Sequence, residues 1–79
     1  MQMQGPVVQF VGDVKTHVVP WIEGLTLIHA MLAAEYQGPG DPGQIALIRD
    51  GQSTLINLQL LLRGHDMDLL PGDRVEIRP

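Results

Sequence analysis

The stretch LTLIHAMLAAEY (residues 25–36) decides the fold, because its spacing predicts the only long helix in the chain. Thr26 can cap this helix, since its side-chain oxygen accepts a hydrogen bond from a free backbone N–H group. The apolar stripe consists of Leu27, Ala30, Met31 and Ala34, flanked by Ile28 and Leu32, and the opposite face consists of His29, Ala33 and Tyr36. A helix with one broad apolar face needs a cover, so we expect one helix lying across one sheet.

Composition limits the class of protein. Seventy-nine residues make one small domain. The absence of cysteine excludes disulfides, iron–sulfur clusters and thiolate zinc sites. Five basic and nine acidic side chains give a net charge of −4 without a basic cluster, which argues against nucleic acid as a partner. The apolar runs are far shorter than the ~20 residues that span a bilayer, so we expect no membrane insertion by this segment.

Two strands are predicted before the helix. Residues 7–11 form a β-rich run in which Val8 and Phe10 face the helix, and residues 16–22 form a second extended run. Pro20 cannot donate a ladder hydrogen bond, so the second strand belongs at the sheet edge. Residues 1–6 are expected to form a flexible segment before a single domain of residues 7–79.

Three further elements are predicted after a loop rich in glycine and proline at residues 37–43. Residues 45–49 and 52–56 form a hairpin, because Asp50-Gly51 favours a type I′ turn. Asn57 can cap a short helical turn that Gly64 closes. Residues 74–78 form the last strand, which needs a partner, and the inner first strand is the natural one, parallel to it. The expected fold is therefore α+β with a mixed sheet of about five strands, in the β-grasp or ubiquitin-like arrangement.

An ordered set of short motifs carries a family resemblance. The motifs are FVGDV (residues 10–14), GLTL (24–27) with Ala30, DP (41–42), IALIR (45–49), NL (57–58), LLRG (61–64) and LPGDRVEI (70–77). Together they resemble an SLBB domain, the soluble-ligand-binding β-grasp module, over nearly the whole chain. The chain departs from the family at His17-Val18, where the family commonly has Pro-Gly, and at Glu35-Tyr36, where it often has Gly-Gly.

The resemblance implies a module without catalytic activity. Similar domains occur in bacterial polysaccharide-export proteins of the outer membrane, where they project into the periplasm and build rings. Others occur in cobalamin carriers and in a flavin-bearing respiratory subunit. A periplasmic location is implied in this way alone, and cytoplasm is the alternative because the N-terminus lacks a signal peptide. A ubiquitin-like or sulfur-carrier role is disfavoured, because the chain ends Glu76-Ile77-Arg78-Pro79 rather than Gly-Gly.

Catalytic and metal-binding patterns are weak. Ser53, the only serine, lacks the Gly-x-Ser-x-Gly elbow of a nucleophile. No two of the three histidines (His17, His29 and His65) have a metal-binding spacing. Asp66 and Asp68 resemble part of a calcium loop, but the other ligands are missing. We therefore expect no enzyme, no metal and no cofactor.

Trp21 is the residue that most favours an interaction surface. With Pro20 directed inward, Trp21 would point away from the helix together with Val19 and His17. The alternative is that Trp21 covers Val7 and Val11 as ordinary core. One hypothesis is an assembly module that binds itself or other envelope-export proteins, and a second is an oligosaccharide-binding module that uses Trp21 and Tyr36 as stacking surfaces.

Overall fold

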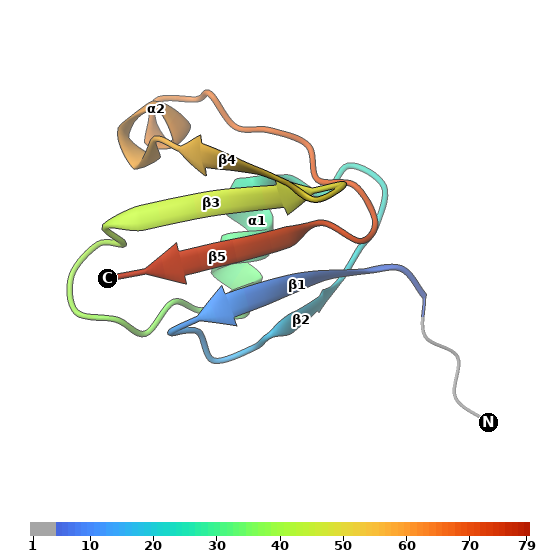
Figure 1. Cartoon of the computed structure of the whole chain (residues 1–79), viewed down its shortest axis with the longest axis horizontal. Coiled ribbons are helices and arrows are strands. Elements are labelled where there is room, and N and C mark those ends of the chain that lie inside the picture. The colour runs from blue at the N-terminus through green and yellow to red at the C-terminus, as the bar shows by residue number, and fades with distance from the viewer. Residues whose placement is uncertain (1–4) are drawn as a thin grey trace.

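The computed structural model of the chain describes residues 5–79, and it has five strands and two helices (Figure 1). In chain order they are β1 (Val7–Gly12), β2 (Val18–Pro20), α1 (Leu27–Ala34), β3 (Gln44–Arg49), β4 (Gln52–Ile56), α2 (Leu58–Leu62) and β5 (Arg74–Arg78). The expected α+β class, with a main helix and a short second one, is confirmed. Residues 1–4 of the expected flexible segment lie outside the described part of the chain.

The strands form one mixed sheet in the order β2-β1-β5-β3-β4. The last strand lies in the middle, where β5 runs parallel to β1 and antiparallel to β3 (Figure 1). The predicted parallel pairing of the first and last strands is therefore confirmed. β2 lies at one edge, as the proline in it requires.

The core lies between the sheet and the helices. Alternate residues of the inner strands, such as Val8, Phe10, Val75 and Ile77, are buried on the face that α1 covers. From the helices and the last loop, the buried side chains are Leu27, Ala30, Ala34, Leu61 and Leu69. Within residues 5–79, no helix lies over the opposite face of the sheet, and apolar side chains such as Val11 are exposed on it.

Two side chains cap the start of α1. The Thr26 hydroxyl accepts a hydrogen bond from His29 N at 3.4 Å, as predicted. Asp66 Oδ1 accepts bonds from Ile28 N at 3.1 Å and from Met67 N at 2.8 Å. Partial burial opposes ionisation of Asp66, but its hydrogen bonds outweigh burial and lower the pKa of this carboxyl below its ordinary value. The last loop therefore takes part in starting the helix.

The helix ends earlier than predicted. Glu35 adopts the left-handed conformation with φ 59°, and its N–H bonds to Met31 O at 3.0 Å. This conformation stops the helix, so Tyr36 lies outside it and packs half-buried against the core instead of on the predicted polar face. Leu32, predicted at the flank of the apolar stripe, is 70% exposed.

The predicted faces of the second strand are reversed. Val19, expected to point outward, is only 4% exposed, and Pro20 is exposed. Val19 lies directly opposite Val8 in the antiparallel pair. Residues opposite each other share a face, so the buried Val8 determines that Val19 is buried too. β2 is also shorter than the extended run predicted over residues 16–22.

The later turns follow the prediction closely. Asp50 and Gly51 have φ values of 54° and 76°, both positive as a type I′ turn requires. Asn57 Oδ1 accepts a bond from Leu60 N at 3.2 Å and caps α2. The hairpin and the short second helix therefore arise from local signals.

An ion pair between the half-buried Arg49 and the buried Asp73 fixes the start of β5. Asp73 is 2% exposed and accepts hydrogen bonds from Arg49 Nε at 2.9 Å, Arg49 Nη2 at 2.6 Å and Leu70 N at 2.7 Å. Burial favours the neutral acid, but the hydrogen bonds and the positive charge of Arg49 outweigh it, so the pKa of Asp73 is lowered. The Asp73 carbonyl also accepts from Gln9 N at 3.0 Å. One residue therefore connects β3, the last turn and β1.

We expect Asp73→Asn to lower the free energy of unfolding by about 2 kcal/mol at pH 7, because Arg49 loses its anionic partner. Because the pKa of Asp73 is lower in the folded chain, its carboxylate stabilises the fold above the ordinary pKa, and this contribution is lost as the pH falls through the lowered value. The difference between wild type and Asp73→Asn should therefore shrink on acidification. Urea unfolding at several pH values measures it.

Glu76→Gln is the matched control for this experiment. Glu76 forms a longer ion pair, 3.7 Å from Arg78 Nη2, in which the Arg78 side chain is mostly exposed. Exposed pairs contribute little, so this variant should change the free energy of unfolding by less than about 0.5 kcal/mol. An equal effect of the two substitutions would contradict the structural role given to Asp73.

Candidate interaction site

An apolar groove of about 440 Å³ lies between α1 and α2. Its walls come from both helices and from the residues that follow α1. The lining residues are Ile28, Met31, Leu32, Glu35, Tyr36, Pro42, Leu58, Leu61 and Leu62. We call this the α1–α2 groove. A pocket of this size is in the range of sites that accept a ligand or a few partner side chains.

Large aliphatic side chains at the groove are exposed to solvent. Leu32 on α1 is 70% exposed, and Leu62 on α2 is 65% exposed. Each helix also has a buried leucine, Leu27 on α1 and Leu61 on α2, so both helices have an inner and an outer apolar side. Exposed apolar side chains gathered around a hollow are typical of protein interaction sites.

Glu35 is the only residue of the groove lining that carries a formal charge. Its left-handed backbone favours glycine, and a non-glycine residue there costs about 1–2 kcal/mol. Such strain in a protein is often kept where the side chain has a function. The carboxylate gives the groove a negative rim.

Tyr36 contributes its ring to the groove but not its hydroxyl group. Within residues 5–79, the Tyr36 hydroxyl oxygen is buried without a hydrogen-bond partner. It lies against Gly38, where an added Cβ would collide with it. Gly38 is therefore needed to let the ring lie in this position, and the hydroxyl is not presented to a ligand in the groove.

Trp21 lines a different hollow beside β1 and β2, with a volume of about 520 Å³. Its indole N–H donates to the Leu69 carbonyl at 2.7 Å, and its backbone N–H donates to Pro6 O at 2.8 Å. The ring is half-buried and packs against the core. Trp21 is therefore a part of the fold as well as a wall of this hollow, which Val7, Val18 and Pro20 also line.

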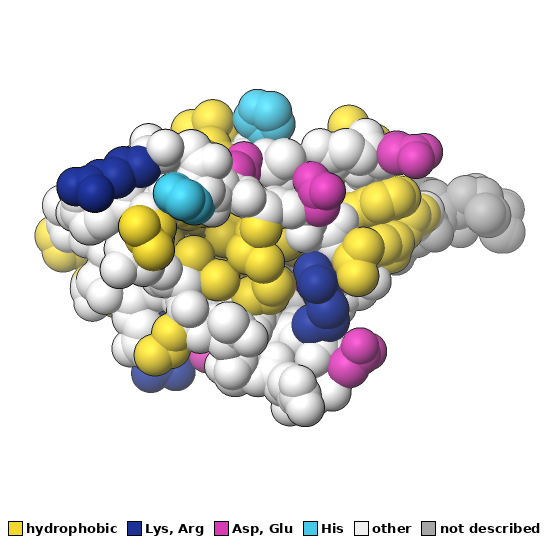
Figure 2. All heavy atoms as spheres, turned by 90° about the horizontal axis from the view of Figure 1, so that it is seen from above, with side chains coloured by type: hydrophobic (Ala, Val, Ile, Leu, Met, Phe, Trp, Pro, Cys, Tyr) yellow, Lys and Arg dark blue, Asp and Glu magenta, His cyan; other side chains and the backbone are white. Residues whose placement is uncertain are grey.

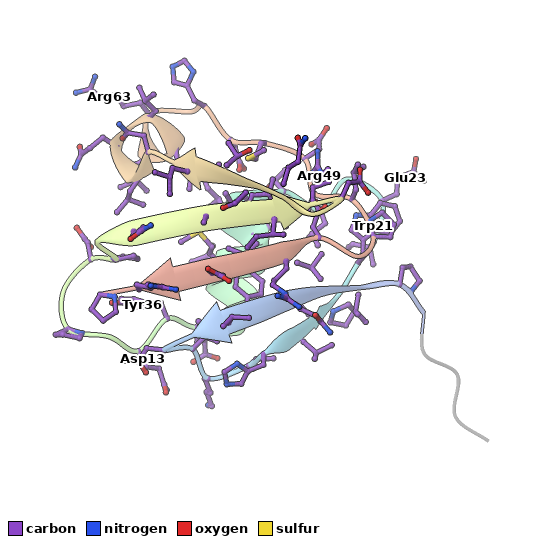
Figure 3. All side chains as sticks on the ribbon, viewed as in Figure 1. Asp13, Trp21, Glu23, Tyr36, Arg49 and Arg63 are labelled. Carbon is purple, nitrogen blue, oxygen red and sulfur yellow. The ribbon has the colours of Figure 1, made fainter. Side chains whose placement is uncertain are left out.

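The four residues predicted as an interaction surface do not lie together. Figure 3 shows Trp21 and Tyr36 at opposite ends of the sheet. The Val19 side chain is buried on the sheet face that α1 covers, so its predicted exposure is wrong. His17 is exposed, and its Nδ1 lies 3.1 Å from the Phe10 carbonyl. A single stacking platform made by Trp21 and Tyr36 is thus excluded by their separation.

The described residues show no arrangement of metal ligands. Within residues 5–79, no group of three or more His, Asp or Glu side chains is placed to hold a metal ion. Asp66, which resembles part of a calcium loop in the sequence, is exposed and caps α1 by accepting the Ile28 N–H. In the same range, neither helix has the length and apolar character needed to cross a bilayer.

No protein-family model matches the chain, and no curated protein matches it in sequence. The resemblance to SLBB domains therefore stays a prediction. The α1–α2 groove was not predicted, because its two walls lie far apart in the sequence. The only sequence signal for it is the leucine run at residues 58–62, which has more apolar residues than one short buried helix needs.

We expect Trp21→Phe to lower the free energy of unfolding by about 1 kcal/mol, because the Leu69 carbonyl loses its donor while the aromatic packing is largely kept. Urea unfolding followed by circular dichroism measures this change. His65→Ala, an exposed histidine in the loop after α2, is the control and should change stability by less than about 0.5 kcal/mol. Unchanged stability of Trp21→Phe would contradict the structural role of the indole N–H.

Proposed function

We propose that the chain is an interaction module without catalytic activity, whose α1–α2 groove binds an amphipathic helix of a partner protein. The resemblance to SLBB domains supports a place in a bacterial polysaccharide-export or related envelope apparatus, with neighbouring proteins of that apparatus as partners. The observation that carries the proposal is the aliphatic groove, which is open to solvent between two helices and has one carboxylate in its lining.

The chemistry of the groove defines the partner. Its walls offer leucine, isoleucine and methionine side chains, which match the apolar face of a helix with anchors at i, i+3 and i+7. Glu35 and the net charge of −4 favour a partner with lysine or arginine beside these anchors. The partner is therefore a basic amphipathic helix.

A glycan fits the groove poorly. Sugars need several polar groups for their hydroxyls, and the groove offers one carboxylate and a tyrosine whose hydroxyl is buried. The hollow beside Trp21 is the better candidate for an oligosaccharide, since it combines an indole ring with the Gln9 amide. This second function uses a separate surface, so the two are distinguishable by where binding occurs.

The first test is titration of the ¹⁵N-labelled protein with a synthetic amphipathic peptide that has leucines at i, i+3 and i+7 and lysines beside them. We expect chemical shift changes in α1, Tyr36 and α2. Leu32→Ser should weaken binding about tenfold, because one large aliphatic contact is lost. A peptide with glutamates in place of the lysines should bind more weakly.

Leu55→Ser is the matched control, because Leu55 is 68% exposed but lies on β4, outside the groove. It should leave the dissociation constant for the peptide unchanged within about twofold. Shift changes that avoid the groove, or equal effects of the two serine variants, would refute the proposed site. Shift changes around Trp21 and Gln9 on addition of an oligosaccharide would support the second function instead.

A second prediction concerns Glu35. We expect Glu35→Gly to raise the free energy of unfolding by roughly 0.5–1 kcal/mol, because glycine accepts the left-handed conformation, while binding of the lysine peptide weakens. Asp50→Gly is the control: Asp50 also has positive φ but lies in the β3–β4 turn, so this variant should not change binding. Unchanged binding of the peptide to Glu35→Gly would remove the charge argument.

A further inference from the structure

The free edge of β4 lacks the features that usually protect an edge strand. Natural edges carry charged residues, proline or bulges, or they are very short. β2 is short and ends in Pro20. β4 has the sequence QSTLI, with no charge and no proline, and pairs with β3 through five consecutive residues without a bulge. It is thus a regular, uncharged edge.

This edge is accessible to another strand. Residues 52–55 are all exposed. Figure 2 views the molecule from the side of α2 and β4, and it shows hydrophobic side chains gathered in the middle of that surface, with charged and histidine side chains around them. Leu55 is 68% exposed, although it lies opposite the buried Ala46 of β3. An additional strand would therefore cover apolar surface as well as backbone.

The hairpin geometry identifies which backbone groups are free. In a hairpin with a two-residue turn, the flanking pair Arg49 and Gln52 exchanges hydrogen bonds, and hydrogen-bonded pairs then alternate along the strands. Thr54 and Ile56 therefore point their backbone groups toward β3, whereas Ser53 and Leu55 point theirs away. Outside the sheet ladder, no backbone hydrogen bond within residues 5–79 involves Ser53 or Leu55.

We propose that β4 pairs antiparallel with β4 of a second copy of the chain, about a two-fold axis at Thr54. In this register Ser53 of each copy lies opposite Leu55 of the other, and each such pair exchanges both N–H···O bonds. All the outward groups of Ser53 and Leu55 are then satisfied. The interface is isologous, and the two sheets join into one continuous sheet.

The side chains fit this register. The two Thr54 residues face each other in a non-hydrogen-bonded pair, and threonine pairs across antiparallel strands are favourable. Gln52 lies opposite Ile56 of the other copy, so no like charges meet within the paired strands. The partner is a second copy because the pattern is self-complementary about Thr54. This surface is separate from the α1–α2 groove, and no residue of β4 lines that groove.

Charge and area predict a weak association. Each copy carries a net charge of −4, so the copies repel at long range, and added salt should strengthen dimerisation. One strand pair buries less than the ~1,200 Å² of stable interfaces, so the dimer should exchange rapidly with the monomer. Sedimentation velocity from micromolar to millimolar protein, at low and high salt, measures this.

Cysteine cross-linking tests the register. The chain has no cysteine, so each variant has one thiol. Thr54→Cys places two thiols on the axis, with Cα atoms about 4.5 Å apart, within the range that a disulfide bridges. Gln52→Cys places them roughly 13 Å apart along the strands. Under mild oxidation, we expect the Thr54→Cys dimer to form about tenfold faster than the Gln52→Cys dimer.

The Ser53→Pro variant tests the pairing of the β4 edge without introducing a cysteine. It removes an outward N–H that β3 does not use, so the fold should remain, as circular dichroism can verify, while association is lost. Leu32→Ser, in the groove, should leave dimerisation unchanged. A strict monomer at millimolar concentration would overturn the proposal, and so would equal cross-linking rates of the two cysteine variants. Association lost in Leu32→Ser but kept in folded Ser53→Pro would equally overturn it.

Discussion

The hydrogen-bonded ion pair between Arg49 and Asp73 is the interaction on which the rest of the structure depends. A buried carboxylate is tolerated only when its oxygens are satisfied, and Arg49 together with Leu70 N–H provides this. The pair joins the end of β3 to the start of β5, and it therefore determines where the last loop returns to the sheet. That loop supplies Asp66, which caps α1, and Met67, whose carbonyl accepts from Leu27 N. The position of α1, and with it one wall of the groove, therefore depends on a charge pair at the point where β3 ends and β5 begins.

Local chemistry predicts most of the fold, and its failures have tertiary causes. The inward residues Val8 and Phe10, the Asp50-Gly51 turn and the Asn57 cap depend on neighbours in sequence, and all three predictions are confirmed. The orientation of Val19 depends on the register with Val8, which the alternation within one strand does not contain. The early end of α1 depends on Glu35, whose left-handed conformation is unusual for a glutamate. The Pro-Gly-Asp sequence at residues 71–73 carries part of the family resemblance, but the burial of Asp73 required knowledge that β3 ends beside it.

The interaction sites were the least predictable part. The resemblance pointed to a binding or assembly module, and Trp21 was the natural residue to choose by its size. In the structure the Trp21 indole N–H donates a hydrogen bond to the Leu69 carbonyl, so this large aromatic side chain stabilises the fold. The α1–α2 groove and the β4 edge rely on different physics, side-chain burial in one and unpaired backbone groups in the other. The two surfaces share no residue, so a dimer paired through β4 would present two grooves, one on each copy. A partner with two helices would then bind with greater avidity than one groove allows.

The central position of β5 has a consequence for how the molecule folds. β5 is the last strand in sequence, yet it separates the two hairpins and pairs with both. Until residues 74–78 have left the ribosome, β1 and β3 each lack β5 as a neighbour, and the central strand that packs against α1 is missing. Closing the sheet then requires contacts between segments more than 60 positions apart, such as Phe10 with Val75, which are slow to form because a long loop must close. The nascent chain therefore exposes its apolar strands until synthesis of the domain is finished, and in the cell its vulnerable period is set by translation as much as by stability.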